Sequence, residues 1–225
     1  MEKIKNIFKE MERFELIGTI IFILALVGVQ FYQGSTKLGL ITGILGIFYV
    51  IFVRMGSRIA CILCMVQIIL YIILAIQSKF YGDMTINIIN FILQFVCWFK
   101  WGKREKENGL IETRSLKKIH FVIIIALWAI TWIFGTYTLH LLGGNTPYLD
   151  SFSTITSLTA MILTVFAYKQ TWNFWILHNI VETIMWSFAI FRGTPNAISM
   201  VIMMLAYLCN SILAYRRWSN NSKTK

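Results

Sequence analysis

Long apolar segments follow one another along almost the whole chain, and they constrain its fold more than any other feature. A transmembrane helix needs about 20 predominantly apolar residues, because it must cross a hydrocarbon layer about 30 Å thick. Segments of that size lie at residues 14–32, 37–53, 57–77, 80–101, 116–140, 147–168, 172–190 and 194–218. The sequence therefore predicts an all-α integral membrane protein with eight spans.

The distribution of basic residues tests this count, because cytoplasmic loops collect Lys and Arg. With eight spans, 18 of the 21 basic residues fall on the side that also receives both termini and the 100–118 loop. The other side receives Lys37, Lys79 and Arg192. We therefore expect a protein of the cytoplasmic membrane with both termini in the cytoplasm. The net charge of +11 is then explained by topology and by attraction to anionic lipid, rather than by nucleic-acid binding.

The polar stretch at 102–115 divides the spans and suggests an internal repeat. Aligning Gly82 with Gly193, 111 residues later, superimposes the third span on the seventh and the fourth on the eighth. We expect two parallel three-helix repeats joined by a linking helix, an architecture known among transporters. The predicted units are an N-terminal segment with an additional helix (1–36), a first repeat (37–101), a loop with the linking helix (102–146), a second repeat (147–218) and a tail (219–225).

Four spans carry a polar, aromatic-rich stripe along one helix face, as the 100° rotation per residue shows. Polar groups that face lipid are costly, about 2.5–3.5 kcal/mol for a charge at the helix centre, so these faces should point inward. The stripes are Asp83, Asn87, Asn90, Gln94, Trp98 and Trp101; Asp150, Ser153, Thr154, Ser157 and Thr164; Trp172, Trp175, Asn179, Glu182 and Trp186; and Asn196, Ser199, Met203, Tyr207 and Asn210.

The mid-span members Asn90, Gln94, Asn179 and Glu182 favour a ligand pocket over simple helix packing. Indole rings can stack on a flat cation while amides bond its polar substituents. Glu182 is either the counter-charge of such a cation or a protonated packing residue.

Other polar residues are expected to have structural roles. A helix–helix hydrogen bond is the preferred interpretation of His178, and of Ser153, Ser157, Thr164 and Ser199. Trp98, Trp101 and Trp218 are expected to belong to the aromatic belt at the membrane interface.

The sequence lacks the common signatures of catalysis. It contains no GxxxxGKS/T phosphate loop, no HExxH, no GxSxG and no His/Cys set with metal-ligand spacing, so we expect neither an enzyme nor a cofactor. Cys61 and Cys64 form a CxxC, for which packing is the preferred interpretation at the reducing cytoplasmic side. A membrane thiol oxidoreductase is the alternative from another class, and a structural subunit without a solute is a third hypothesis.

The motif W-x-x-W-x-x-x-N, present as Trp172, Trp175 and Asn179, resembles that of the PnuC family of vitamin transporters. The resemblance covers residues 37–218 and includes PYLDSFSTITSLTAMIL with Asp150, ETIMWSFAIFRGTP, AYLCNSILAYRRW, and INFILQFVCWFKW with Gln94. It implies two parallel three-helix repeats around a linking helix. It also implies facilitated diffusion of nicotinamide riboside, drawn inward by phosphorylation in the cytoplasm; related groups carry thiamine or riboflavin.

By this resemblance, Trp172, Trp175 and Asn179 contact the substrate together with Asn90 and Gln94, and we add Glu182 and Asp150 to the predicted site. His178 and Glu182 depart from the apolar or hydroxyl residues expected at their positions. Nicotinamide riboside and thiamine are both cations, so an acidic partner suits either vitamin. The expected partners are a small vitamin and the lipid bilayer, and a homo-oligomer is left open.

Overall fold

The structure is a computed structural model that describes residues 11–33, 37–77, 81–107, 109–141, 147–193 and 197–223. These residues form eight helices and no extended strand: α2 (Arg13–Gln33), α3 (Lys37–Met55), α4 (Ile59–Gln77), α5 (Tyr81–Gly102), α6 (Lys118–Leu141), α7 (Pro147–Val165), α8 (Thr171–Phe191) and α9 (Ala197–Lys223). One helix coincides with each predicted span, which confirms the all-α fold. Asn196 and the side chain of Asp83 lie outside the described part of the chain.

The composition of the helices fits a membrane environment. Within the described residues, α2, α6, α8 and α9 are long and apolar enough to cross a bilayer, and α3 and α4 contain the shorter apolar stretches Leu40–Met55 and Ile59–Leu70. Large apolar side chains are exposed along the outer faces, for example Phe31 on α2 and Ile130 on α6. Backbone polar groups in lipid must be satisfied within the segment, as they are in a helix. The chain is therefore a multi-pass membrane protein.

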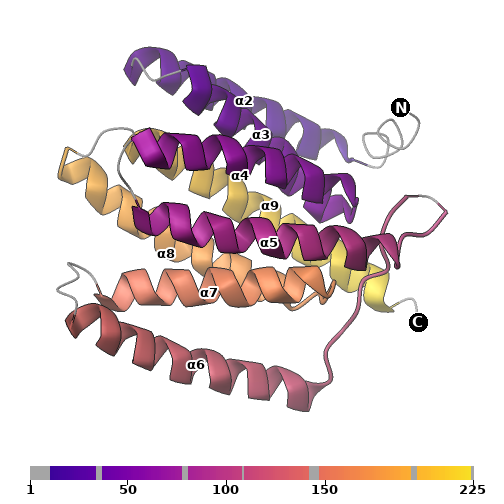
Figure 1. The fold of residues 1–225 in the computed structure, drawn as a ribbon. Coiled ribbons are helices and arrows are strands. Elements are labelled where there is room, and N and C mark those ends of the chain that lie inside the picture. The colour runs from indigo at the N-terminus through magenta and orange to yellow at the C-terminus, as the bar shows by residue number, and fades with distance from the viewer. Residues whose placement is uncertain are drawn as a thin grey trace.

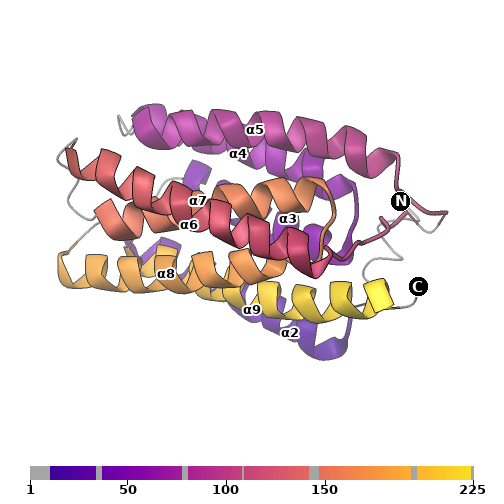
Figure 2. The ribbon, with the colours of Figure 1, turned by 90° about the horizontal axis from the view of Figure 1, so that it is seen from below.

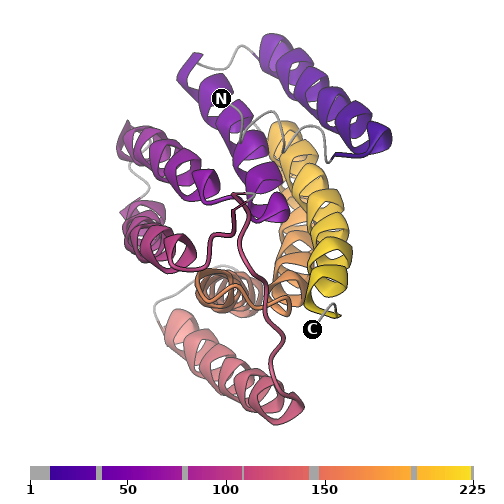
Figure 3. The same cartoon turned by 90° about the vertical axis from the view of Figure 1, so that its right-hand side faces the viewer.

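Six of the described helices form a closed ring, seen from one end in Figure 3. α3, α4 and α5 pack in succession, as do α7, α8 and α9, and the ring closes where α5 packs against α7 and α9 against α3. α2 packs outside the ring on α3 and α9, whereas α6 packs on α7 and buries no residue. α2 and α6 therefore flank the ring on opposite sides (Figure 1).

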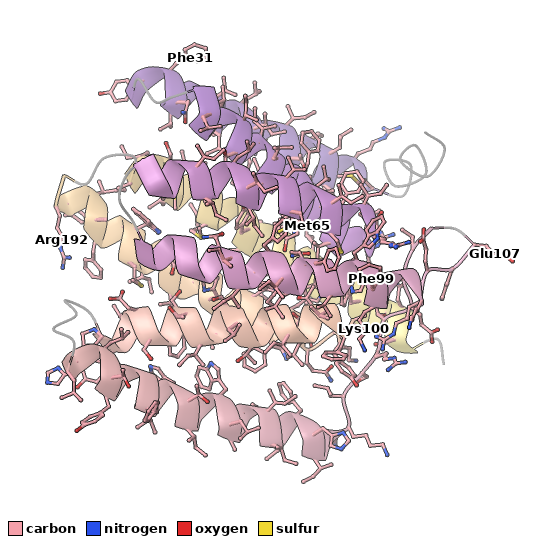
Figure 4. The ribbon with its side chains drawn as sticks, viewed as in Figure 1. Phe31, Met65, Phe99, Lys100, Glu107 and Arg192 are labelled. Atoms are coloured by element: carbon pink, nitrogen blue, oxygen red, sulfur yellow. The ribbon has the colours of Figure 1, made fainter. Side chains whose placement is uncertain are left out.

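One end of the bundle gathers the start of α2, the end of α9 and the linker at residues 103–117 (Figure 2). Lys100 and Glu107 lie at this end and Arg192 at the other (Figure 4). The linker crosses the end of the ring, where Ile111 N donates to Gly56 O and Arg114 N to Ala167 O, both at 2.8 Å. The linker is therefore bonded to both halves of the ring.

The α3–α4 and α7–α8 turns have matching hydrogen bonds. The amide nitrogens of Gly56 and Ser57 donate to the carbonyl oxygens three and five residues earlier, both at 2.9 Å. Those of Ala167 and Tyr168 do the same at 2.9 and 3.0 Å. Gly56 and Ala167 have φ of 73° and 58°, as in helix ends closed by a left-handed residue. The two turns are 111 residues apart, the spacing that the sequence suggested.

Gly82 and Gly193, the two glycines that suggested the spacing of 111, do not occupy equivalent positions in the structure. Gly82 lies inside α5, whereas Gly193 follows the end of α8 and has a positive φ of 68°. The second unit contains additional residues before α9. The two units are therefore aligned at their first turn and shifted at their last helix, and their relation as repeats stays a prediction.

Two predicted interface tryptophans are instead buried in the core. Trp101 is 0% and Trp218 1% exposed. Trp101 Nε1 donates to Thr164 O at 3.0 Å and Trp218 Nε1 donates to Arg54 O at 2.9 Å. Trp101 on α5 thus bonds to the end of α7, and Trp218 on α9 bonds to the end of α3. The prediction that these two residues belong to the aromatic belt at the membrane interface is wrong.

Candidate substrate-binding site

A cavity of about 180 Å³, called here the central cavity, lies inside the ring. Residues from all six ring helices line it, with Tyr49 on α3, Gln67 on α4 and Met161 on α7. α5, α8 and α9 contribute most of its polar lining: Asn87, Asn90, Gln94, Trp172, Trp175, His178, Asn179, Tyr207, Asn210 and Ser211.

The structure brings five of the seven predicted site residues to the central cavity and leaves two outside. The five are Asn90, Gln94, Trp172, Trp175 and Asn179. Asp150 lies in the first turn of α7, eleven residues before the lining residue Met161, or about 16 Å along the helix axis. Glu182 lies next to a lining residue rather than in the lining itself.

Two buried carboxamides are held in place across the cavity. Asn179 on α8 is 2% exposed, and its Nδ2 donates to Ser211 Oγ on α9 at 3.1 Å. Gln94 on α5 is 3% exposed, and its Nε2 donates to the Tyr49 hydroxyl on α3 at 3.3 Å. Because these bonds fix each amide to a side chain of another ring helix, the amides are pre-organised to bind a polar solute.

The indole nitrogens of the two motif tryptophans differ in their hydrogen bonding. Trp175 Nε1 donates to Thr164 Oγ1 at 3.1 Å. Trp172 Nε1 is buried and has no partner among the described residues, and neither has the Oδ1 atom of the lining residue Asn210. A buried polar group without a partner costs about 1–3 kcal/mol, so an acceptor from a bound solute would relieve that cost at Trp172.

Glu182 belongs to a polar cluster between α7 and α8. Ser153 Oγ donates to one carboxylate oxygen of Glu182 and lies 3.0 Å from His178 Nδ1. Trp186 Nε1 donates to the other carboxylate oxygen at 3.1 Å. The helix–helix hydrogen bond predicted for His178 is confirmed, as is that for Ser153. His178 lines the central cavity, so the carboxyl group of Glu182 lies one side chain behind the lining.

The charge of the lining limits the solutes that suit it. No described lining residue is Lys, Arg, Asp or Glu, and His178 is the one imidazole. No group of three or more His, Cys, Asp or Glu in the described residues could hold a metal ion. The cavity is therefore polar and aromatic, without a fixed cation that could pair with a phosphate group.

Several lining residues were not among the predicted site residues. Tyr207 and Asn210 belong to the polar stripe of the last span, which the sequence predicts to face inward. Gln67 is an amide in the middle of an otherwise apolar span, which is itself a sign that the residue faces the interior of the protein. Tyr49 has no such signal, because its span shows no polar stripe.

The CxxC corresponds in position to the tryptophan motif of the other half. Cys61 and Cys64 lie 111 residues before Trp172 and Trp175, the spacing of the two matched turns. Both thiols are free and buried, and Cys64 lines the central cavity as Trp175 does. This placement favours packing over a redox role.

The sequence profile of a family described as "Nicotinamide mononucleotide transporter" matches residues 36–220. The chain belongs to this family. The profile spans the six ring helices, α6 and the linker, and it therefore contains every residue of the central cavity.

Individual members of the family resemble the chain over nearly its full length. It is 24% identical to the nicotinamide riboside transporter PnuC of Neisseria mucosa over 221 residues, 96% of this chain and 84% of the relative. It is 26% identical to the nicotinamide riboside transporter PnuC of Haemophilus influenzae over 211 residues, 92% of this chain and 89% of the relative. A crystal structure of the vitamin B3 transporter PnuC superimposes with a TM-score of 0.82 at 24% identity, covering 97% of this chain and 96% of the other.

Proposed function

We propose that this protein carries nicotinamide riboside across the cytoplasmic membrane by facilitated diffusion. The observation that carries the proposal is the central cavity, whose lining includes two fixed amides, Gln94 and Asn179, and Trp172 with its unpaired indole N–H. A carboxamide and ribose hydroxyls supply the acceptors and donors that such groups require. Family membership and the relatives that are named nicotinamide riboside transporters support the same solute.

The lining favours the riboside over the mononucleotide. A phosphate group carries one to two negative charges and is usually bound by Arg, Lys or helix N-termini. The described lining contains no Arg or Lys, but it contains Trp172 and Trp175, and an indole ring attracts a pyridinium cation. Glu182 lies behind the lining residue His178, and its carboxylate adds negative charge on the α8 side of the cavity.

Transport requires the two units to move relative to each other. The cavity of about 180 Å³ is smaller than the roughly 300–1,000 Å³ typical of small-molecule sites, so the solute enters only after rearrangement. In our proposal, the units at 37–101 and 147–218 are parallel repeats that rock around the cavity and open it to one side at a time. The basic end with both termini and the linker is cytoplasmic, where phosphorylation traps the vitamin.

Uptake into proteoliposomes tests the proposal. We expect labelled nicotinamide riboside to equilibrate across the bilayer without an ion gradient, and Asn179→Leu to abolish this uptake while the protein remains folded. A requirement for a proton or sodium gradient would contradict facilitated diffusion. Competition with unlabelled thiamine, nicotinamide mononucleotide and nicotinamide riboside identifies the solute. Stronger competition by thiamine or the mononucleotide than by the riboside would overturn the assignment.

A further inference from the structure

A second cavity lies outside the ring, between α2, α3 and α9, and the transport proposal does not use it. We call it the α2 cavity; its volume is about 360 Å³, twice that of the central cavity. Its lining is largely apolar: Phe14, Gly18, Phe22, Ile47, Val50, Ile51, Ala206, Ile212 and Leu213, with Thr19, Cys209 and Asn210. Two charged residues, Glu15 and Arg54, complete it.

The guanidinium group of Arg54 is buried and only partly paired. The residue is 2% exposed, and its Nη1 lies 3.5 Å from Glu15 Oε1. Its Nε and Nη2 are buried and have no hydrogen-bond partner among the described residues. Buried charged donors are normally fully paired, because an unpaired one loses its hydration without compensation. Within the described part of the chain, two guanidinium donors at this cavity therefore lack an acceptor.

The local charge favours an anionic acceptor. Glu15 and Arg54 together are neutral, and the positive charge of Arg217 is close enough to act on Arg54. A planar guanidinium with two free N–H groups matches the oxygens of a phosphodiester.

The depth of the two charged residues matches that of a lipid head group. Glu15 lies in the first turn of α2 and Arg54 in the last turn of α3, at the end of the bundle that holds the linker. From there the lining continues to Phe22 on α2 and Ile47 on α3, each seven residues further in, or about 10 Å along the helix. The cavity therefore has a polar end at the membrane interface and an apolar part inside the hydrocarbon layer.

We propose that the α2 cavity binds a membrane phospholipid, with its phosphodiester on the guanidinium of Arg54 and part of one acyl chain between α2 and α9. The lipid bridges the additional helix to the ring, because residues of α2, α3 and α9 all line the cavity. No step of solute transport depends on this site.

Gly18 provides a way to block the cavity without disturbing the fold. It lines the α2 cavity, and a Cβ built at its position meets no atom within 4 Å. Gly28, on the same helix, also has no atom within 4 Å of a built Cβ but does not line the cavity. Gly18→Leu therefore fills the cavity, and Gly28→Leu is its matched control with the same gain in helix propensity.

The test is thermal unfolding of the full chain, purified in detergent and depleted of lipid, with and without dioleoyl phosphatidylglycerol. We expect the lipid to raise the Tm of the natural sequence and of Gly28→Leu by about 5 °C at saturating concentration, and that of Gly18→Leu by less than about 1 °C. Dioleoylglycerol, which lacks the phosphate, and inorganic phosphate alone should each produce little shift.

Glu15→Gln supplies a second, independent readout. It removes the carboxylate that pairs with Arg54, so we expect a lower Tm without lipid and a larger rise when phosphatidylglycerol is added. A full shift in Gly18→Leu would overturn the proposal. An equal shift with dioleoylglycerol would show that the phosphate is not recognised, and an equal shift with inorganic phosphate would make the occupant a free anion; either result also overturns it.

Discussion

Gly56 and Ala167 lie 111 residues apart, both have a positive φ at the turn after a helix, and both carbonyl oxygens accept a hydrogen bond from the linker at 2.8 Å. Position 56 therefore holds glycine, the residue best suited to a positive φ, whereas position 167 holds alanine. A left-handed conformation costs an L-residue about 1–2 kcal/mol relative to glycine.

We expect substitutions at this pair to have unequal effects on stability. Gly56→Ala should cost at least about 2 kcal/mol, since it combines the positive φ with a Cβ only 3.1 Å from Ile111 Cγ1. Ala167→Gly should change stability by less than about 1 kcal/mol, because relief of strain is offset by the loss of a buried methyl group. Thermal unfolding in detergent measures both. Equal and opposite shifts would contradict the prediction.

Because the indole N–H of Trp172 is unpaired, we expect its removal to affect substrate binding more than protein stability. Trp172→Phe should weaken nicotinamide riboside binding about tenfold, the effect of one neutral hydrogen bond, and should lower stability by about 1–2 kcal/mol through lost packing alone. Trp101→Phe is the comparison, because Trp101 Nε1 donates to Thr164 O. It should lower stability by about 2–3 kcal/mol. Calorimetric titration and thermal unfolding give the two quantities, and a loss of stability at Trp172 equal to that at Trp101 would refute the distinction.

Glu182 can be tested with two forms of the vitamin that differ in charge. Nicotinamide riboside is a cation, and its reduced dihydro form is neutral and of nearly the same shape. Glu182→Gln keeps one acceptor oxygen for the Trp186 indole N–H, while its NH2 group donates to Ser153 Oγ in place of the bond that Ser153 donates to the carboxylate. We expect it to weaken binding of the cation about three- to tenfold and to leave the neutral form unchanged. Equal losses for both ligands would assign Glu182 to packing.

The buried thiols should be dispensable for transport. Cys61 and Cys64 are 1% and 5% exposed, and both are free. We expect the double variant Cys61→Ala/Cys64→Ala to lose up to about 2 kcal/mol of stability and to keep riboside uptake within about twofold. Loss of uptake in a variant that still folds would support the thiol oxidoreductase hypothesis.

The helices could be predicted from the sequence because apolar length and basic flanks are strong signals, but their ends could not. α7 ends at Val165 rather than at 168, because Ala167 is left-handed and alanine gives no sign of it. α9 continues to Lys223, beyond the predicted end at 218, because hydropathy does not report where a helix leaves the membrane. Trp101 and Trp218 show a similar limit: an aromatic residue at a span end can face lipid or cap a neighbouring helix.

The candidate site could be predicted in part, because helical periodicity gives a face but not a depth. Asn90, Gln94 and Asn179 share a face with their stripes and also lie at the level of the cavity. Asp150 shares a face with Ser153 yet lies too near the end of α7. Tyr49 required the three-dimensional structure, since only the closure of the ring brings its hydroxyl on α3 to Gln94 on α5.

The linker is anchored to the bundle on both sides of Glu107. On the N-terminal side, the Arg58 guanidinium lies 3.8 Å from the Glu105 carboxylate; on the C-terminal side, Ile111 and Arg114 bond to the two turns. Glu107 itself projects away from the bundle (Figure 4). A polypeptide severed after Glu107 would thus keep one anchored linker segment on each fragment. Two separately synthesised halves should reassemble in the membrane as a functional complementing pair.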